Sequence, residues 1–123
     1  MPKVAITVWG SRISPVFESA SRVRLIQVVQ SRSTWLDDLS LPHDPMSRIA
    51  LLGEHGVQVL ICGAISGLQA SIIRAWEIEL IPFVTGDAQE VLAAYIQGEL
   101  HAERFTLPGC FRRQRHRRRR GRR

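Results

Sequence analysis

Signals for the start of three helices alternate with short apolar runs along the chain, and this alternation limits the fold more than any other feature. Asp44 followed by Pro45 is a typical helix start, because the carboxylate accepts from free N–H groups of the first turn and proline is tolerated at the first helical position. Ser66 and Asp87 each precede a glutamine or glutamate by three residues, which forms a capping box. The sequence therefore predicts three amphipathic helices separated by strands.

Five runs rich in apolar and β-branched residues predict the strands. The second and third runs are joined by a short polar turn, and the third carries Asp37 and Asp38, as is typical of an edge strand. Ser14 before Pro15 predicts a short helix over Pro15–Ser21. The predicted strands are Lys3–Trp9, Arg22–Val29, Ser33–Leu41, Val57–Cys62 and Ile78–Val84.

Strands that alternate with amphipathic helices favour a mostly parallel sheet covered on both faces, a three-layer α/β/α arrangement. We expect a mixed five-stranded sheet of order 3-2-1-4-5 in which strand 2 is antiparallel. The first and fourth strands then lie side by side with connections that leave in opposite directions, which is where ligands of open α/β sheets bind. The walls of this place would be Gly10–Phe17, Cys62–Gly67 and Thr85–Asp87.

Charge divides the chain into two parts. Residues 112–123 hold nine arginines and no acidic residue, whereas residues 1–111 hold eight basic residues against eleven acidic ones, a net charge of −3. The pI of about 10.9 therefore describes the final segment. We expect residues 1–111 to form one α/β domain and residues 112–123 to be a disordered arginine-rich tail, because such a segment is too charged to bury.

Cysteine usage and hydropathy bear on the compartment. The chain has two cysteines and no apolar run near the ~20 residues that cross a bilayer. The start of the chain lacks the separate basic, apolar and cleavage regions of a signal peptide. We expect a cytoplasmic protein with no membrane contact, since low cysteine usage is typical of a reducing compartment.

Four motifs resemble the dinitrogenase iron–molybdenum cofactor biosynthesis family, and they occur in the family's order. They are Val8–Phe17, Leu60–Ser66, Pro82–Asp87 and Leu107–Cys110 followed by an arginine-rich run. The resemblance covers residues 3–110 and implies a ribonuclease H-like fold, with binding or carriage of an iron–sulfur cluster or iron–molybdenum cofactor precursor and a link to nitrogen fixation. Members of the family often carry a His-Phe-Gly segment after the first strand, whereas this chain has Ser14-Pro15-Val16-Phe17 and no histidine before position 43. Histidine ligation there is not carried over.

The loops at the predicted strand ends supply the candidate binding residues. A glycine-containing loop that opens a helix presents backbone N–H groups to an anion, and Arg12 is a cation for an acidic cofactor, with solvent exposure as its alternative. The candidate cofactor-binding residues are Gly10, Ser11, Arg12, Ser14, Phe17, Gly63, Ala64, Ser66, Thr85 and Gly86.

Two cysteines and one histidine are candidate metal ligands. Cys62 ends an apolar strand, so its thiol either faces the predicted site or packs as a small buried hydrophobe. Cys110 lies at the boundary with the tail, either as a reactive thiol or ligand or as an incidental cysteine, and His101 precedes it on the same segment. Two cysteines do not complete a four-thiolate cluster site, so further ligands or a second subunit would be needed.

Three functions follow as hypotheses. The first is a non-enzymatic carrier of an iron–sulfur or iron–molybdenum cofactor precursor, whose partners are cofactor-assembly or acceptor proteins. The second is binding of nucleic acid or another polyanion by the tail, with a solubilising extension as its alternative. The third is a ligand-free interaction domain. Nuclease chemistry needs clustered carboxylates, and the first strand carries none. The oligomeric state stays open.

Overall fold

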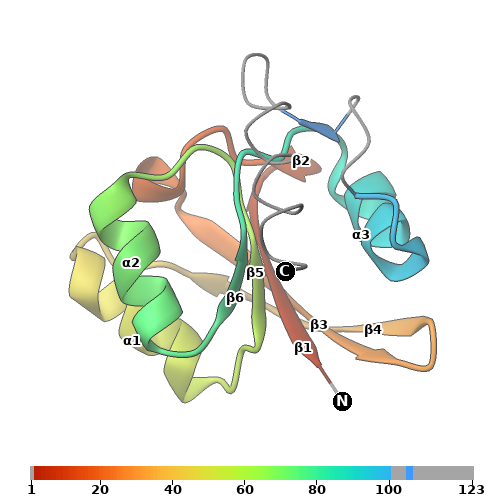
Figure 1. The fold of residues 1–123 in the computed structure, drawn as a ribbon, viewed down its shortest axis with the longest axis horizontal. Coiled ribbons are helices and arrows are strands. Elements are labelled where there is room, and N and C mark those ends of the chain that lie inside the picture. The colour runs from red at the N-terminus through yellow and green to blue at the C-terminus, as the bar shows by residue number, and fades with distance from the viewer. Residues whose placement is uncertain (1, 101–104, 107–123) are drawn as a thin grey trace, which may run out of the picture.

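The computed structural model describes residues 2–100, 105 and 106. Figure 1 shows the chain as a sheet with helices on both faces. In chain order the elements are β1 (Lys3–Trp9), β2 (Arg12–Ile13), the 3-10 helix η1 (Phe17–Ser19), β3 (Arg22–Val29), β4 (Arg32–Ser40), α1 (Pro45–Glu54), β5 (Val59–Ile61), α2 (Gly67–Ala75), β6 (Glu79–Ile81) and α3 (Ala88–Gln97).

The sheet has the order β4-β3-β1-β5-β6. β1, β5 and β6 are parallel neighbours, and β3 is antiparallel to both β1 and β4. This confirms the predicted order and the antiparallel second strand. The prediction lacked β2, which folds back on the end of β1 and pairs Val8 with Ile13.

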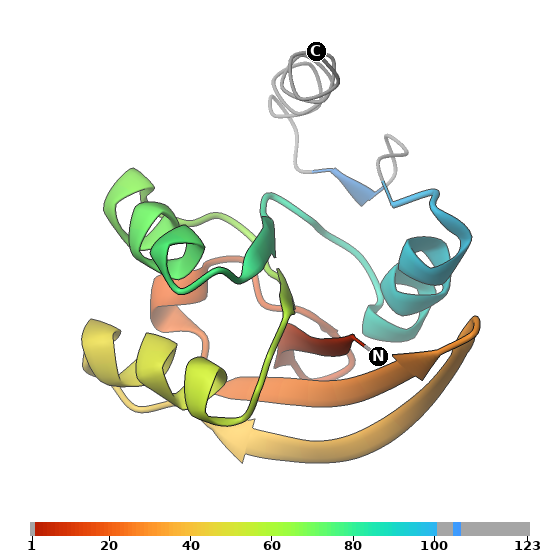
Figure 2. The same ribbon diagram turned by 60° about the horizontal axis from the view of Figure 1, so that its bottom comes forward.

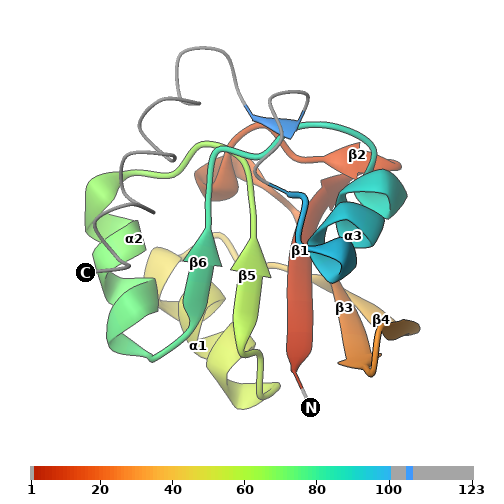
Figure 3. The same ribbon diagram turned by 45° about the vertical axis from the view of Figure 1, so that its right-hand side comes forward.

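Helices cover the two faces of the sheet unequally. α1 and α2 lie on one face and α3 lies on the other (Figures 2 and 3), which confirms the three-layer arrangement. Apolar side chains alternate along the strands because successive residues point to opposite faces, and two buried clusters result. One contains Ala5, Leu25, Ile49, Leu60 and Ile73, and the other contains Ile6, Ile26, Ile61, Val91 and Phe105.

Side-chain caps start all three helices where the sequence predicted them. Asp44 accepts from the N–H of Ser47 at 2.9 Å, and Asp87 accepts from the N–H groups of residues 89 and 90 at 3.0 and 3.1 Å. Ser66 accepts from the N–H of Gln69 at 3.3 Å. The capping box predicted at Ser66 is wrong in its second bond. The N–H of Ser66 donates to the side chain of Glu18 and not to that of Gln69.

The helix predicted over Pro15–Ser21 is also wrong in its start and length. The structure has the three-residue helix η1, which Val16 precedes without a side-chain cap. The N–H of Ser14 donates to the carbonyl of Thr7 at 3.0 Å, so Ser14 extends the β1–β2 hairpin and is not free to begin a helix. Residue 14 is buried within this pairing.

Within the described residues, no helix is long and apolar enough to cross a membrane. The predicted boundary at residue 111 and the predicted disorder of 112–123 lie outside the described part of the chain and stay predictions.

Candidate functional site

Loops from the carboxyl ends of three parallel strands meet at one edge of the sheet (top of Figure 3). The loop after β1 and the loop after β5 exchange two backbone hydrogen bonds: Phe17 N–H donates to the Ala64 carbonyl, and Ala64 N–H donates to the Pro15 carbonyl, both at 2.8 Å. Val16 and Ala64 form an isolated parallel bridge. These two loops therefore form one continuous backbone layer over the end of the sheet.

The loop before α3 joins the same layer. The N–H of Ile13 donates to the Gly86 carbonyl at 2.9 Å, and the N–H of Ala88 donates to the Ser11 carbonyl at 2.8 Å. Phe83 N–H donates to the Gly63 carbonyl at 2.8 Å, which ties the loop after β6 to the loop after β5. The structure thus brings together all three predicted segments, Gly10–Phe17, Cys62–Gly67 and Thr85–Asp87; we call them the three-loop layer.

Backbone contact fills much of the predicted opening. A Cβ at Gly63 would collide with the carbonyl oxygens of Ser14 and Pro15 and would lie 2.6 Å from the carbonyl carbon of Pro15. A cavity of about 270 Å³ lies beside the segment that joins β1 to β3, lined by Val8, Trp9, Ser14, Pro15, Ser19 and Ser21. The indole of Trp9 is 74% exposed at this cavity.

A buried guanidinium joins α1 to η1 and to the segment before α1. Arg48, on α1, donates to the carbonyl oxygens of Phe17, Ala20 and Pro42, and its side chain lies 4.9 Å from the centre of the Phe17 ring. The residue is 3% exposed. Burial lowers the pKa of the guanidinium and the negative charge of Glu18 opposes this, but arginine remains charged.

Cys62 lies inside the core and not at the cavity. It is fully buried in the cluster between the sheet and helices α1 and α2, together with Phe17 and Ile65. Burial, reinforced by the charge of Glu18, raises the pKa of the thiol far above its usual value. In this conformation Cys62 packs as a small hydrophobe, which was the alternative to a ligand.

The other predicted binding residues divide by exposure. Ser11, Arg12 and Ser66 have exposed side chains, whereas Ser14 and Phe17 are buried. Thr85 and Gly86 are half-buried, and the N–H of Thr85 donates to the Phe105 carbonyl at 2.9 Å. Gly10 and Gly86 have positive φ and shape turns, and Gly63 and Ala64 supply the close backbone contacts. Cys110 and His101 lie outside the described residues.

Sequence reasoning missed three residues of this region: Trp9, Glu18 and Arg48. Arg48 had a detectable signal, since it falls four residues before Leu52 on the apolar face of its helix. A charged residue at such a position needs buried partners. Glu18 had no comparable signal, because its partner Ser66 is 48 residues away.

The described residues do not supply the donor set of a covalently ligated cluster. Among them, no three His, Cys, Asp or Glu side chains lie close enough to hold a metal ion. Iron–sulfur clusters are held by several thiolates, and the one described cysteine is buried and protonated. What the three-loop layer offers a ligand is the exposed hydroxyls of Ser11 and Ser66 and the exposed Arg12.

These features define a small three-layer α/β protein in which backbone hydrogen bonds join three loops at the carboxyl ends of the parallel strands. The model of the dinitrogenase iron–molybdenum cofactor family matches residues 1–98, and the chain belongs to this family.

Two solved structures show the same fold. The protein designated PH0822 aligns with a TM-score of 0.76 at 14% identity, covering 89% of this chain and 98% of that one. The apo form of the orange protein from Desulfovibrio gigas aligns with a TM-score of 0.64 at 17% identity, covering 80% of this chain and 90% of that one. At these identities the likeness shows the fold alone. No curated protein matches the chain.

Proposed function

We propose that this protein is a non-enzymatic carrier that binds an iron–sulfur or iron–molybdenum cofactor precursor and passes it to a cofactor-assembly or acceptor protein in the cytoplasm. Membership of the dinitrogenase iron–molybdenum cofactor family over residues 1–98 is the observation that carries this proposal. The site geometry then bears on how the cargo would be held.

Non-covalent binding suits the residues that the three-loop layer presents. Arg12 is exposed on β2, and its backbone forms an isolated antiparallel β-bridge with Asp87, whose carboxylate caps α3. Ser11 and Ser66 add exposed hydroxyls. A metal–sulfur precursor is an anionic cargo, so a cation and hydrogen-bond donors on a rigid backbone layer would hold it without thiolate bonds. Contacts of this kind also release cargo readily, as a carrier requires.

The proposal includes no catalytic step, because the described residues of the three-loop layer lack the groups that acid–base chemistry needs. β1 carries no acidic residue, and the exposed polar groups of the three-loop layer include no paired acid and base. Cys110 and His101 remain candidate ligands on sequence grounds alone.

Anaerobic reconstitution with iron and sulfide tests the carrier proposal. We expect the full chain to bind iron and sulfide with visible absorbance, Arg12→Ala to bind less, and Cys62→Ala to bind as the parent does. Arg74→Ala is the matched control, because Arg74 is an exposed arginine on α2 away from the loop layer. Protein that takes up no iron would contradict the carrier role, and equal uptake by Arg12→Ala would contradict the proposed mode of binding.

The charge division of the chain favours a second candidate, binding of a polyanion by residues 112–123. Nine arginines without a neighbouring acid would bind nucleic acid by counterion release, which depends steeply on salt. Replacement of the four arginines at 117–120 by glutamine should weaken retention on single-stranded RNA and reduce its salt dependence, since five arginines of the segment remain. Retention that is unchanged in this variant would refute the role.

A further inference from the structure

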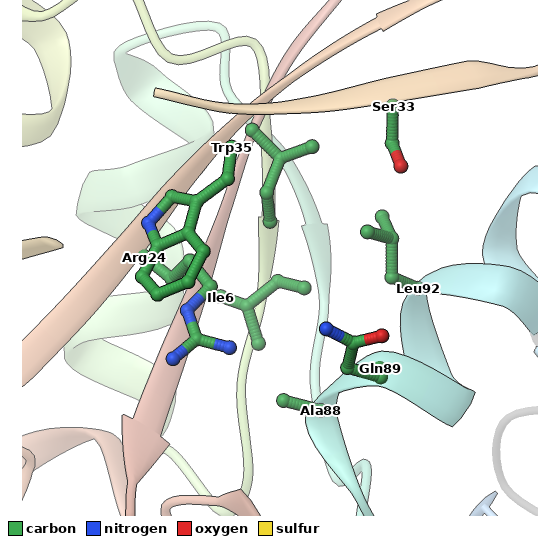
Figure 4. Close-up of a pocket in the computed structure, with 8 residues that line it drawn as sticks. Ile6, Arg24, Ser33, Trp35, Ala88, Gln89 and Leu92 are labelled. Carbon is green, nitrogen blue, oxygen red and sulfur yellow. The ribbon is translucent and has the colours of Figure 1, made fainter. Parts of the chain in front are cut away.

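A second hollow lies away from the three-loop layer, on the face of the sheet that α3 covers. It is a groove of about 220 Å³ between α3 and strands β3 and β4 (Figure 4). Ile6 lies at the floor of the groove, Trp35 and Arg24 lie on one side, and Leu92 and Gln89 lie on the other (Figure 4). Ile26 also lines the groove. None of these residues belongs to the three-loop layer.

The groove exists because one helix covers this face of the sheet. Trp35 and Leu36 on the edge strand β4 stay 59% and 45% exposed, in contrast to residues 4–8 of β1 and all of β5, which are buried. A large exposed indole beside buried isoleucines gives the groove an apolar wall that an aromatic or aliphatic group can contact.

One carboxylate fixes both polar residues on the Trp35 side. Oδ1 of Asp38 accepts from Nε of Arg24 at 3.2 Å and from Nε1 of Trp35 at 3.0 Å. The guanidinium carbon of Arg24 lies 4.3 Å from the centre of the indole ring. The side chains of Arg24 and Asp38 are 17% and 20% exposed, so solvent screens this pair only in part. The guanidinium is therefore held in one orientation before any ligand arrives.

In that orientation the terminal nitrogens of the guanidinium are not bonded to Asp38 and lie at the groove. Asp38 contacts Nε instead, and one of the two terminal nitrogens points toward Ala88 and Gln89 (Figure 4). The planar fork of these nitrogens matches the two oxygens of a carboxylate, and a fork that is already fixed loses little freedom on binding. The amide of Gln89 across the groove adds a neutral donor.

We propose that this groove binds a small apolar carboxylate, of the size of one aromatic ring with its acid group. The carboxylate lies on the terminal nitrogens of Arg24 and near the amide of Gln89, and the ring lies against Trp35 and the two isoleucines. A single cation next to Asp38 favours a monoanion over phosphate, and the apolar floor favours a hydrocarbon body over a small hydrophilic ion.

Titration of the full chain with phenylacetate tests the proposal, with the Trp35 indole N–H signal in NMR spectra as the readout. The signal is assigned by its loss in Trp35→Phe. We expect a saturable shift, and affinity about tenfold or more lower for the neutral isostere phenylacetamide, since hydrogen bonds to charged groups are the stronger ones.

Two variants and one control separate recognition from fold. Arg24→Gln should lower the affinity for phenylacetate about tenfold or more. Gln89→Glu should do the same, because its own carboxylate would occupy Arg24 while a glutamate in the first turn of α3 favours the helix. Arg22→Gln, on the same strand and outside the groove, should bind as the parent does.

The result that overturns the proposal is equal affinity for phenylacetate and phenylacetamide, or no shift of the Trp35 signal at millimolar phenylacetate. Unchanged affinity in both Arg24→Gln and Gln89→Glu would also overturn it. If Arg24→Gln fails to fold, Gln89→Glu alone decides. No arm of the test depends on metal, so its outcome is independent of the carrier proposal.

Discussion

Oε2 of Glu18 accepts a hydrogen bond from the backbone N–H of Ser66 at 2.8 Å, which joins the short helix after β2 to the start of α2. A capping box would have given this N–H to the side chain of Gln69. Desolvation raises the pKa of the Glu18 carboxyl, but the bonds from Ser66 outweigh it and the net pKa is below the usual value. A tertiary contact has thus replaced a local one.

Replacement of Glu18 by glutamine should lower the free energy of unfolding by about 1 kcal/mol near neutral pH, because a neutral acceptor replaces a charged one. The lowered pKa means that the stabilisation by Glu18 is present above the usual pKa of glutamate and is lost as pH falls through the lower folded value. Urea denaturation at several pH values measures the difference between parent and variant. A difference that grows in acid would contradict this reading, and Glu54→Gln, at an exposed glutamate of α1, serves as control.

Replacement of Arg48 by methionine should lower the free energy of unfolding by about 3 kcal/mol or more. Methionine fills similar space but leaves three carbonyl oxygens without their charged donor. Arg48→Lys should recover little of this, since an ammonium lacks the fork that reaches all three carbonyls. Equilibrium urea unfolding gives the values, and Arg74→Met on the exposed side of α2 should stay within about 0.5 kcal/mol of the parent.

Alanine at Gly63 should destabilise the protein by about 2 kcal/mol or more, because the new Cβ meets rigid backbone at Ser14 and Pro15. Alanine at Gly67 is the matched control. No neighbouring atom lies within 4 Å of a Cβ there, and the residue begins α2, so the change should be neutral or stabilise by up to about 1 kcal/mol. Thermal unfolding distinguishes the two, and similar melting temperatures would show that the loops do not approach so closely.

The buried thiol of Cys62 should not react with Ellman's reagent in the native protein. Thiolate is the reactive form, and burial both shields the sulfur and raises its pKa. A Cys110→Ser background isolates this thiol, and addition of guanidinium should release one full equivalent. Rapid reaction without denaturant would show that the thiol reaches solvent, and would restore Cys62 as a candidate ligand.

The same raised pKa predicts a pH dependence of stability. The unfolded thiol ionises near its usual pKa of about 8.5 whereas the folded thiol does not, so the stabilisation is full below that pH and is lost above it. Cys62→Ala lacks this loss, and its deficit in unfolding free energy relative to the parent should narrow as pH rises above about 8.5. A deficit that stays constant up to pH 10 would contradict the assignment.

The strand order and the helix starts could be predicted because their signals are local. Asp44, Ser66 and Asp87 begin helices through bonds to residues two or three positions later, and these follow from spacing alone. β5 lies next to β1 and β6 next to β5, because parallel strands with short connecting helices pack back on the same sheet. The two-residue strand β2 carried no such signal, since a hairpin that short depends on the end of β1.

The position of the three-loop layer at the sheet was predicted, but the side chains that line and support it were not. The segments around residues 10–17, 62–67 and 85–87 meet because all follow parallel strands of one sheet. The side chain of Cys62, just after β5, could point toward the three-loop layer or into the core between the sheet and helices α1 and α2. The apolar residues around Cys62 do not determine this direction, because it depends on how α1, α2 and η1 pack against the sheet.

The sequence by itself determined the layers, the order of the strands and the three helix caps, because alternation of apolar residues and capping side chains act over a few positions. Only the tertiary structure decided that Arg48 joins α1 to η1, that Glu18 caps a helix distant in sequence, and that Asp38 fixes Trp35 and Arg24 together. Each of these depends on the distance between side chains of elements that meet only after the chain has folded, and no local pattern encodes such a distance.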